Sequence, residues 1–345
     1  MELAISTIRV NESDDYILPV PLAVSAPCRE LRIPLDCAGY RLDQTLARLF
    51  PTHSRSRLQS WLKAGRISVD GEQREAKFRV AGGELLHVVE QETPNEKPDA
   101  ADAAEDIPLS ILFEDPSILV MNKPAGLVVH PGSGNWSGTL LNALLHHAPE
   151  LSGVPRAGIV HRLDKDTSGL MVVARTLEAQ TDLIRQLQAR TVQRHYLALV
   201  HGVPAAAGEI SAPIGRHPTQ RTRMAVLDSG RPALTRYRVC ERFSSSSLVE
   251  CRLQTGRTHQ IRVHMASIGH PLIGDPTYGR RRCGDALLDG FRRQALHAFR
   301  LGLRHPVTHQ DMVWEAPIPD DFQHLLDRLR GAGGQLAQVG MVSER

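Results

Sequence analysis

The chain of 345 residues is 41% hydrophobic and 23% charged, with a formal net charge of +3, a balance that excludes fibrous and intrinsically disordered classes. Its five cysteines are odd in number and lack C-x-x-C spacing, which argues against a disulfide framework or a zinc site and favours a reducing cytoplasm. No apolar run approaches the roughly 18 residues of a membrane span and no signal peptide is visible, so we expect a cytoplasmic protein that does not engage a membrane.

The hydrophobic pattern changes repeatedly within the first 50 residues. Residues 1–30 show no sustained period and are expected to form a disordered extension. Residues 31–35 alternate between apolar and polar side chains, which predicts a strand. Leucines then recur at helical spacing from position 42 to position 49, and Pro51 ends the helix that this spacing predicts.

A second helix is predicted from a serine cap at position 54 to a glycine stop at position 65. The Asp-Gly turn at residues 70–71 then predicts a β-hairpin whose second strand runs to Val80. Residues 31–90 as a unit resemble the S4 RNA-binding domain, whose αα-β core presents a basic helix to structured RNA. That resemblance implies RNA-binding roles for four basic residues on or beside the second helix: Arg55, Arg57, Lys63 and Arg66.

A change of composition separates this unit from the rest of the chain. Residues 91–106 are rich in Pro, Glu, Asp and Ala without a large apolar side chain, which is typical of a flexible linker. A larger domain is expected over residues 107–330, followed by a disordered tail at residues 331–345. Within that domain, apolar periodicity predicts strands at 118–121, 127–130, 159–160, 170–174, 196–200, 234–240 and 248–253, and helices at 139–147 and 177–187. Because strands outnumber helices and do not alternate with them regularly, the expected class is α+β with a mixed, largely antiparallel sheet.

A polar block at residues 161–169 lies between two of these apolar runs. Asp164 stands beside Arg162 and Lys165 in the sequence, and neighbouring cations lower the pKa of a carboxylate and keep it ionised. A carboxylate held charged on a loop between two strands is a candidate nucleophile or general base.

Two other interpretations fit the same block. In the first, residues 166–169 form a tight turn in which Gly169 supplies a positive φ angle. In the second, Asp164 begins a calcium-binding loop of the EF-hand type, with the pattern D-x-D-x-S-G. The calcium interpretation fails because the twelfth position, which needs a bidentate glutamate, is Arg175, and because the flanking segments are strand-like.

Four motifs in a fixed order carry a more specific signal. They are Asn-Lys-Pro-Ala-Gly at residues 122–126, His-Arg-Leu-Asp and its continuation at residues 161–169, the segment around Tyr196, and residues 256–265 with the Gly-Asp-Pro-Thr-Tyr-Gly run that follows. This set resembles the RluA/RluD-type pseudouridine synthases, which isomerise uridine in RNA. Together with the S4-like start, the resemblance covers about residues 35–330.

The resemblance implies a pseudouridine synthase fold and three catalytic residues. Asp164 would either attack C1′ of the ribose as a nucleophile or remove the C2′ proton to give a glycal, and both routes stay open. Arg262 would be its charge partner, and Tyr196 would stack on the target base and assist proton removal at C5; without the motifs, these two residues would be interpreted as an ordinary ion-pair partner and a core tyrosine. Substrate-binding roles are implied for Arg162, which would fill the space left by a flipped base, and for Arg257, His259, Ile261, Asn122 and Lys123.

The implied isomerisation oxidises nothing and releases no group, so we expect no cofactor and no metal. His259 and His264 lie five residues apart and do not share a helix face, which also argues against a metal site. The implied partner is 23S ribosomal RNA of the large subunit, at the helix 69 stem-loop, and the enzyme is expected to act as a monomer. The alternatives are a sister synthase acting on other large-subunit uridines, a non-catalytic S4-type assembly factor, and a phosphoryl-transfer enzyme using Asp164, Asp166 and Mg²⁺.

Overall fold

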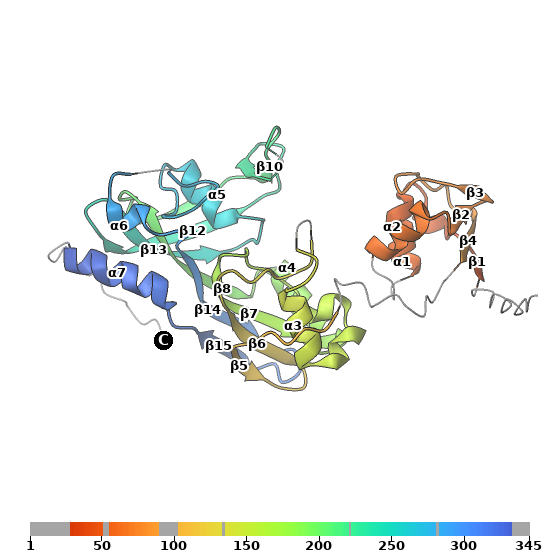
Figure 1. Ribbon diagram of the computed structural model, residues 1–345, viewed down its shortest axis with the longest axis horizontal. Coiled ribbons are helices and arrows are strands. Elements are labelled where there is room, and N and C mark those ends of the chain that lie inside the picture. Colours follow the sequence, from red (N-terminus) through yellow and green to blue (C-terminus); the bar gives the residue numbers. More distant parts are fainter. Residues whose placement is uncertain are drawn as a thin grey trace, which may run out of the picture. The chain divides into compact units, whose positions relative to one another are not determined.

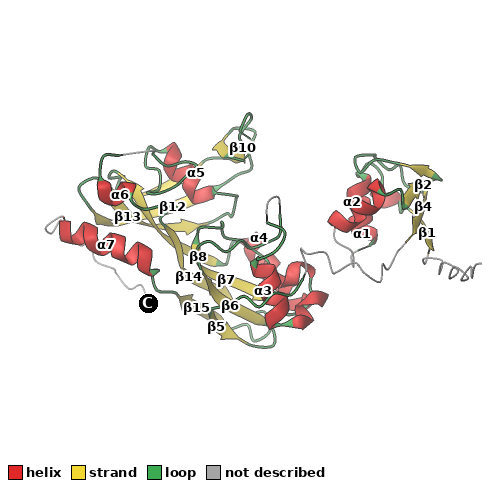
Figure 2. Cartoon of the chain, in the orientation of Figure 1, coloured by secondary structure: helices red, strands yellow, loops and turns green. Residues whose placement is uncertain are grey.

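The computed structural model describes residues 28–50, 55–89, 103–132, 135–220, 222–280 and 283–332. The chain divides into two compact units, residues 1–96 and residues 97–345. Figure 1 labels the elements of each unit, and Figure 2 distinguishes the helices from the strands. Among the helices that the described residues form, none has both the length and the apolar character needed to cross a membrane.

The smaller unit packs two helices, α1 (Leu42–Leu49) and α2 (Arg55–Lys63), against an antiparallel sheet with the strand order β1-β4-β2-β3. Its strands are β1 (Cys28–Arg32), β2 (Ile67–Val69), β3 (Glu72–Gln73) and β4 (Leu85–Val89). Leu46, Leu58 and Trp61 from the two helices are buried in one core with the inward residues of the sheet. Both predicted helices are therefore confirmed, while the serine cap at position 54 lies outside the described residues.

The first strand of this unit is Cys28–Arg32, so the prediction of a strand at residues 31–35 is wrong. Pro34 has no N–H with which to continue a strand ladder, and the chain enters a short 3-10 helix at Leu35–Cys37. The described chain consequently begins inside the segment that was expected to be a disordered extension, and residues 1–27 lie outside the described part.

The second strand of the hairpin ends at Gln73 rather than at Val80. The segment beyond it bonds to the first turn of α1: the carbonyl oxygen of Phe78 accepts from Leu42 N at 2.7 Å. Backbone groups that form hydrogen bonds with the first turn of a helix cannot also pair with a neighbouring strand. The longer strand therefore does not form.

The larger unit is built on a nine-stranded mixed sheet with the order β5-β6-β7-β14-β8-β13-β12-β9, and β15 pairs with β14. Only β7 and β14 run parallel; the other neighbours are antiparallel. The strands are β5 (Ile111–Glu114), β6 (Ile118–Lys123), β7 (Ser168–Ala174), β8 (Gln193–His201), β9 (Ala207–Ser211), β12 (Leu234–Arg242), β13 (Ser246–Leu253), β14 (Leu296–Arg304) and β15 (Asp311–Glu315). A separate hairpin joins β10 (Ile214–Arg216) to β11 (Met224–Val226). The expected class, α+β with a mixed and largely antiparallel sheet, is confirmed.

Helices cover both faces of this sheet (Figure 1). They are α3 (Leu140–His147), α4 (Leu177–Ala189), α5 (Gln260–Ser267), α6 (Ala286–Asp289) and α7 (Asp320–Ala332). Apolar residues of α3 and α5 share one core with Leu119 of β6 and Ala198 of β8, whereas α4 packs with Val120 on the opposite face. Helices α6 and α7 form a further core with Leu199 of β8. Successive residues of β6 and β8 thus enter different cores, which explains their continuous apolar runs.

The strand predicted at residues 127–130 is wrong, because this segment caps the N-terminus of α3 instead of joining the sheet. The carbonyl oxygens of Val128 and Val129 accept the N–H groups of Leu140 and Leu141 at 2.8 and 3.2 Å. The first N–H groups of a helix have no partner within the helix, and this apolar segment satisfies two of them.

The run at residues 159–160 also forms no strand, since Ile159 makes only one isolated bridge, to Val173. The φ angles of Arg156 and Ala157 are 57° and 48°, which turn the chain out of an extended path just before the run. Local β propensity is overridden here by the geometry of the preceding turn.

The packed part of the larger unit begins at Ala103, inside the segment predicted to be a linker. The Ala103 carbonyl accepts from Asn142 Nδ2 at 2.7 Å, and a carboxylate oxygen of Glu105 accepts from Gly138 N at 2.9 Å. At the other end α7 continues to Ala332. Residues 90–102 and 333–345, where most of the expected linker and tail fall, lie outside the described residues.

Candidate active site

A cavity of about 780 Å³ lies where three stretches of the larger unit meet: residues 156–167, residues 184–196 and residues 253–262. Its volume is in the range of sites that hold small molecules or single nucleotides. The predicted site residues that line it are Asp164, Tyr196, Arg262, Arg162, Arg257, His259 and Ile261. Two others, Asn122 and Lys123, are not among its lining residues.

Asp164 opens a tight turn at residues 164–167, in which Thr167 N donates to the Asp164 carbonyl oxygen at 3.1 Å. The turn therefore lies two residues before the predicted position at 166–169. Gly169 does have a positive φ of 117°, but it lies in β7, where an added Cβ would be 2.3 Å from the carbonyl oxygen of Ala298. Glycine is required there because β7 approaches β14 closely, and that contact fixes the end of the loop that carries Asp164.

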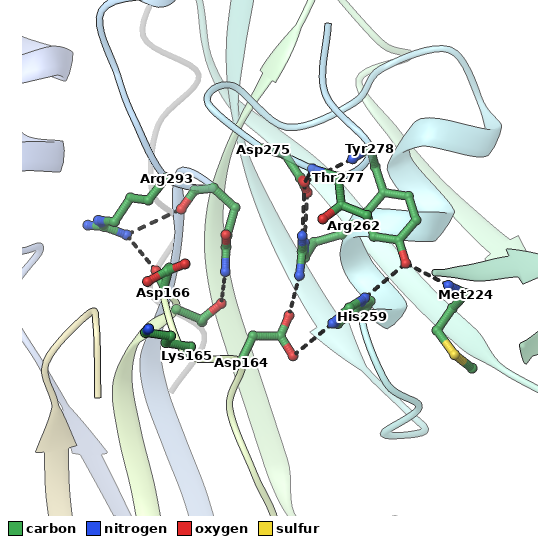
Figure 3. Close-up of polar contacts among 12 residues, drawn as sticks. Asp164, Lys165, Asp166, Met224, His259, Arg262, Asp275, Thr277, Tyr278 and Arg293 are labelled. Atoms are coloured by element: carbon green, nitrogen blue, oxygen red, sulfur yellow. Dashed lines mark hydrogen bonds and ion pairs between the residues drawn. The ribbon is translucent and has the colours of Figure 1, made fainter. Parts of the chain in front are cut away.

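The side chain of Asp164 meets an arginine already held by a second carboxylate (Figure 3). Arg262 Nη1 donates to Asp164 Oδ2 at 3.0 Å, while its Nε and Nη2 donate to the two oxygens of Asp275 at 2.7 and 2.9 Å. Asp275 Oδ1 also accepts from the backbone N–H groups of Thr277 and Tyr278 at 2.8 and 2.9 Å. The guanidinium is thus fixed in orientation before it touches Asp164.

The charges in this cluster are stable at neutral pH. Burial alone would lower the pKa of Arg262, but the hydrogen bonds and charge of Asp275, with the charge of Asp164, raise it above its ordinary value. Burial, the largest single cause, would raise the pKa of Asp275, but the bond and charge of Arg262 together with the backbone N–H groups of Tyr278 and Thr277 outweigh it and lower that pKa. The side chain of Asp164 is 19% exposed and that of Arg262 only 5%, so the carboxylate faces the cavity while the arginine lies behind it.

His259 approaches the other oxygen of Asp164, with Nε2 3.8 Å from Oδ1. Its Nδ1 lies 2.8 Å from the hydroxyl of Tyr278, and that hydroxyl accepts from Met224 N at 2.8 Å (Figure 3). The tautomer with its proton on Nε2 fits both partners, because Nε2 then presents its proton to the Asp164 carboxylate and Nδ1 accepts the Tyr278 hydroxyl proton. Burial is the main cause that lowers the pKa of His259, so this neutral tautomer prevails at pH 7.

Tyr196 lies on β8 and lines the cavity, although the residue is only 6% exposed. Its hydroxyl makes no hydrogen bond within the described residues. Burial raises the pKa of Tyr196 to about 12, so the side chain is a neutral phenol under all ordinary conditions. Tyr196 is therefore both a buried core residue and part of the cavity wall, so each of the two sequence-based interpretations describes part of its environment.

Lys123, which was expected to bind substrate, is fully buried and does not line the cavity. Its Nζ donates to three backbone carbonyls, those of Pro124, Leu127 and Lys165, at 2.7, 2.9 and 2.9 Å. Burial lowers the pKa of Lys123 to about 7. Its place is therefore structural: it ties the first motif to the turn that carries Asp164. The neighbouring Asn122 is half-buried in β6 and does not line the cavity.

The remaining predicted substrate-binding residues differ in their surroundings. Arg162 is exposed at the cavity and makes no hydrogen bond or ion pair within the described residues. Arg257 is half-buried, with Nε 3.2 Å from the carbonyl oxygen of Pro232. Ile261 is 3% exposed and contributes an apolar wall from α5. Of the arginines Arg162 and Arg257, only Arg162 makes no hydrogen bond to another described residue.

The basic residues predicted to bind RNA cluster along α2 and just after it. Lys63 at the end of α2 is exposed and Arg66 is half-buried, and neither forms an ion pair within the described residues. Arg55 and Arg57 belong to the first turn of α2, and their side chains lie outside the described part. No cluster of three or more metal-binding side chains occurs among the described residues.

The sequence analysis missed three residues that the structure places at this site: Asp275, Tyr278 and Arg194. Asp275 and Tyr278 belong to the Gly-Asp-Pro-Thr-Tyr-Gly run, whose acid and aromatic side chain were quoted as a motif without a role. Arg194 precedes Tyr196 by two residues and therefore points to the same side of β8. The alternation of a strand was the available signal for Arg194, whereas no local pattern indicates the partner of Asp275.

Comparison with known proteins places this site in a family. Residues 117–267 match the family model described as RNA pseudouridylate synthase, and residues 41–86 match that of the S4 domain. The chain belongs to the RNA pseudouridine synthase family, and it is an enzyme of that class with an N-terminal S4 domain. The alternatives of a non-catalytic assembly factor and of a phosphoryl-transfer enzyme are therefore wrong.

Several relatives resemble the chain over nearly its whole length. Ribosomal large subunit pseudouridine synthase D of Nitrosomonas europaea is 59% identical over 87% of this chain and 88% of its own length. The Pseudomonas aeruginosa protein of the same name is 54% identical over 88% of this chain and 96% of its own. Among solved structures, human RNA pseudouridylate synthase domain containing 4 is 28% identical with a TM-score of 0.52, covering 64% of this chain and 93% of that one.

Proposed function

We propose that this enzyme converts specific uridines of large-subunit (23S) ribosomal RNA to pseudouridine, and that its target is the helix 69 stem-loop. The first part is supported by relatives of more than 50% identity whose names specify the ribosomal large subunit. The narrower target is supported by the presence in one chain of an S4 domain, suited to structured RNA, and of a cavity whose volume fits a single nucleotide. A ribosomal substrate would place the enzyme in the cytoplasm, where we expect it to act as a monomer.

The single observation that carries the chemical proposal is the placing of Asp164. Its carboxylate faces the cavity while Arg262 holds it from behind at 3.0 Å. Either proposed route needs an ionised aspartate within reach of the ribose: as a nucleophile it bonds to C1′, and as a base it takes the C2′ proton. Arg262 serves both by holding the carboxylate in a fixed position, because its own orientation is fixed by Asp275.

The target uridine must leave its base stack to reach Asp164, which costs a few kcal/mol. Arg162 would fill the gap in the RNA stack, a role supported by its exposure at the cavity without a partner among the described residues. Tyr196 would receive the flipped base on its ring. With a pKa near 12, Tyr196 acts in this proposal by stacking, and not as a phenolate that removes the C5 proton.

The experiment that tests the substrate maps pseudouridines in ribosomal RNA from cells lacking this protein, by carbodiimide-stopped reverse transcription. Loss confined to the helix 69 loop, restored by the wild-type gene and not by Asp164→Asn, supports the proposal. An unchanged loop with losses at other large-subunit uridines would assign the protein to a sister activity with the same catalytic residues. Unchanged pseudouridines throughout the large-subunit RNA would contradict the ribosomal assignment itself.

A further inference from the structure

Arg194 lines the cavity from β8, two residues before Tyr196. Alternate residues of a strand share a face, so the two side chains belong to the same wall. Arg194 is only 8% exposed, which makes it one of the most deeply buried cations around the cavity. The other buried arginine there, Arg262, is 4% exposed and bonds two carboxylates.

Arg194 has no such compensation. Its Nε is buried without a hydrogen-bond partner, and the side chain forms no ion pair within the described residues. Burying a guanidinium without a partner costs free energy, because its charge loses its hydration and gains no compensating interaction. Its guanidinium lies directly against the backbone of Gly256, where a Cβ would be 2.8 Å from Arg194 Nη1. Burial lowers the pKa of Arg194, yet a guanidinium remains charged at neutral pH.

An unpaired cation in a cavity wall implies a ligand that brings negative charge, and the reaction of this family generates one. When the N1–C1′ bond breaks, its electron pair departs with the uracil, whose negative charge spreads over N1, O2 and O4. This holds whether Asp164 bonds to C1′ or takes the C2′ proton. The base then turns and C5 bonds to C1′, while the Asp164–C1′ bond breaks in the first route or Asp164 returns its proton to C2′ in the second. The C5 proton is lost and N1 takes up a proton, so the product is an isomer of the substrate.

We propose that Arg194 is a further catalytic residue, which stabilises the detached uracil anion through hydrogen bonds from its guanidinium to a carbonyl oxygen of the base. A fixed donor in a site that excludes water stabilises charge that develops during the reaction far better than it does in bulk solvent. The inference rests on the proposed placing of the base against Tyr196, because the same wall then presents Arg194 to the ring. The proposal explains why Arg194 is buried without a counter-charge in the enzyme without substrate.

The test compares Arg194→Gln and Arg194→Lys with Arg185→Gln, which removes the same charge from an exposed position of α4 that does not line the cavity. We expect Arg194→Gln to lower the single-turnover rate about 100-fold or more at saturating enzyme, with RNA affinity changed less than about threefold. Arg194→Lys should be intermediate, since lysine keeps the charge but not the planar fork. Arg185→Gln should retain the wild-type rate.

Thermal unfolding of the same variants separates catalysis from a structural role. Because Arg194→Gln removes an unpaired buried charge, its unfolding temperature should equal or exceed that of the wild type. A lower unfolding temperature with loss of RNA binding would mean that Arg194 supports the fold, and would overturn the proposal. Weaker RNA binding with an unchanged single-turnover rate would make it a phosphate contact, and would overturn the proposal as well.

A substrate change tests the charge directly. RNA with 5-fluorouridine at the target carries a base whose anion is more stable, so the rate defect of Arg194→Gln in forming the 5-fluoro C-glycoside should shrink. An equal defect with both substrates would contradict anion stabilisation. Activity retained by Asp164→Asn would instead refute the proposed aspartate chemistry. That chemistry would not explain a rate defect of Arg194→Gln, so the two proposals can fail separately.

Discussion

Arg262 Nη1 lies 3.0 Å from Asp164 Oδ2, although the two residues are 98 positions apart in the chain. Asp164 lies on the turn before β7. Arg262 lies on α5, which follows β8, β12 and β13 in the chain. The contact therefore exists only when β7 and β13, which β14 and β8 separate, are assembled in one sheet. It makes the position of the Asp164 carboxylate depend on the folding of the larger unit as a whole.

Asp164→Asn should abolish pseudouridine formation while RNA affinity stays within a few-fold of wild type. Asparagine keeps the shape and one acceptor for Arg262 but can act neither as a nucleophile nor as a base. Tritium release from C5-labelled uridine RNA measures turnover, and filter binding measures affinity. The matched control is Asp166→Asn, which removes the next carboxylate of the same turn and should retain activity. Substantial turnover by the Asp164→Asn enzyme would remove Asp164 from its proposed role.

Asp275→Asn should destabilise the larger unit by about 3 kcal/mol, because it leaves Arg262 without one of its buried partners. The pKa of Asp275 is lowered in the folded state, so its contribution is fully present above its ordinary value of 3.8 and is lost as the pH falls through the lower folded value. Unfolding free energies of wild type and variant should therefore differ at pH 7 and converge below pH 3.8. A constant difference down to the lowest accessible pH would contradict this assignment.

Tyr278→Phe should lower the single-turnover rate about fivefold, the equivalent of about one hydrogen bond, without weakening RNA binding. The variant loses the hydroxyl that sets the tautomer of His259, so Nε2 no longer presents its proton to Asp164 in a fixed orientation. The double variant with His259→Gln tests this coupling. If Tyr278 acts through His259, the combined loss should be smaller than the sum of the single losses in free energy. Additive losses would show that the two residues act independently.

Replacing both Lys63 and Arg66 by alanine should weaken RNA binding and reduce the slope of log affinity against log salt by about 2. Both cations are located at the end of α2 without ion-pair partners among the described residues, as phosphate-binding side chains would be. Lys77→Ala, an exposed cation of the same unit away from α2, is the control and should leave the slope unchanged. An unaltered slope in the double variant would mean that this helix does not contact phosphates.

Short-range patterns predicted much of the framework correctly. Thr139 and Thr176 accept from Asn142 N and Ala179 N at the starts of α3 and α4, as capping residues do, and both helices were predicted. Strands β6, β7, β12 and β13 also follow from their apolar runs. These elements depend on capping, turn residues and periodicity within about ten positions, which a single sequence displays.

Failures occurred where distant backbone groups compete for the same segment. The apolar run at residues 127–130 satisfies the start of α3, and the hairpin segment before Val80 satisfies the start of α1, so neither becomes a strand. Lys123 was assigned to the substrate because it lies in a motif, but three carbonyls brought together by folding enclose its ammonium group. Sequence patterns indicate what a side chain can do, and not which partner will reach it.

The sequence by itself determined the chemistry available to this protein: one aspartate on a polar turn, an aromatic residue on a strand, and arginines in ordered motifs. Only the tertiary structure decided how these groups act on one another. It placed Arg262 between Asp164 and Asp275, directed the proton of His259 toward the same carboxylate, and left Arg194 buried without a counter-charge beside Tyr196. The physical reason is that charge, burial and hydrogen-bond direction depend on distances between residues far apart in the chain, which local periodicity does not encode.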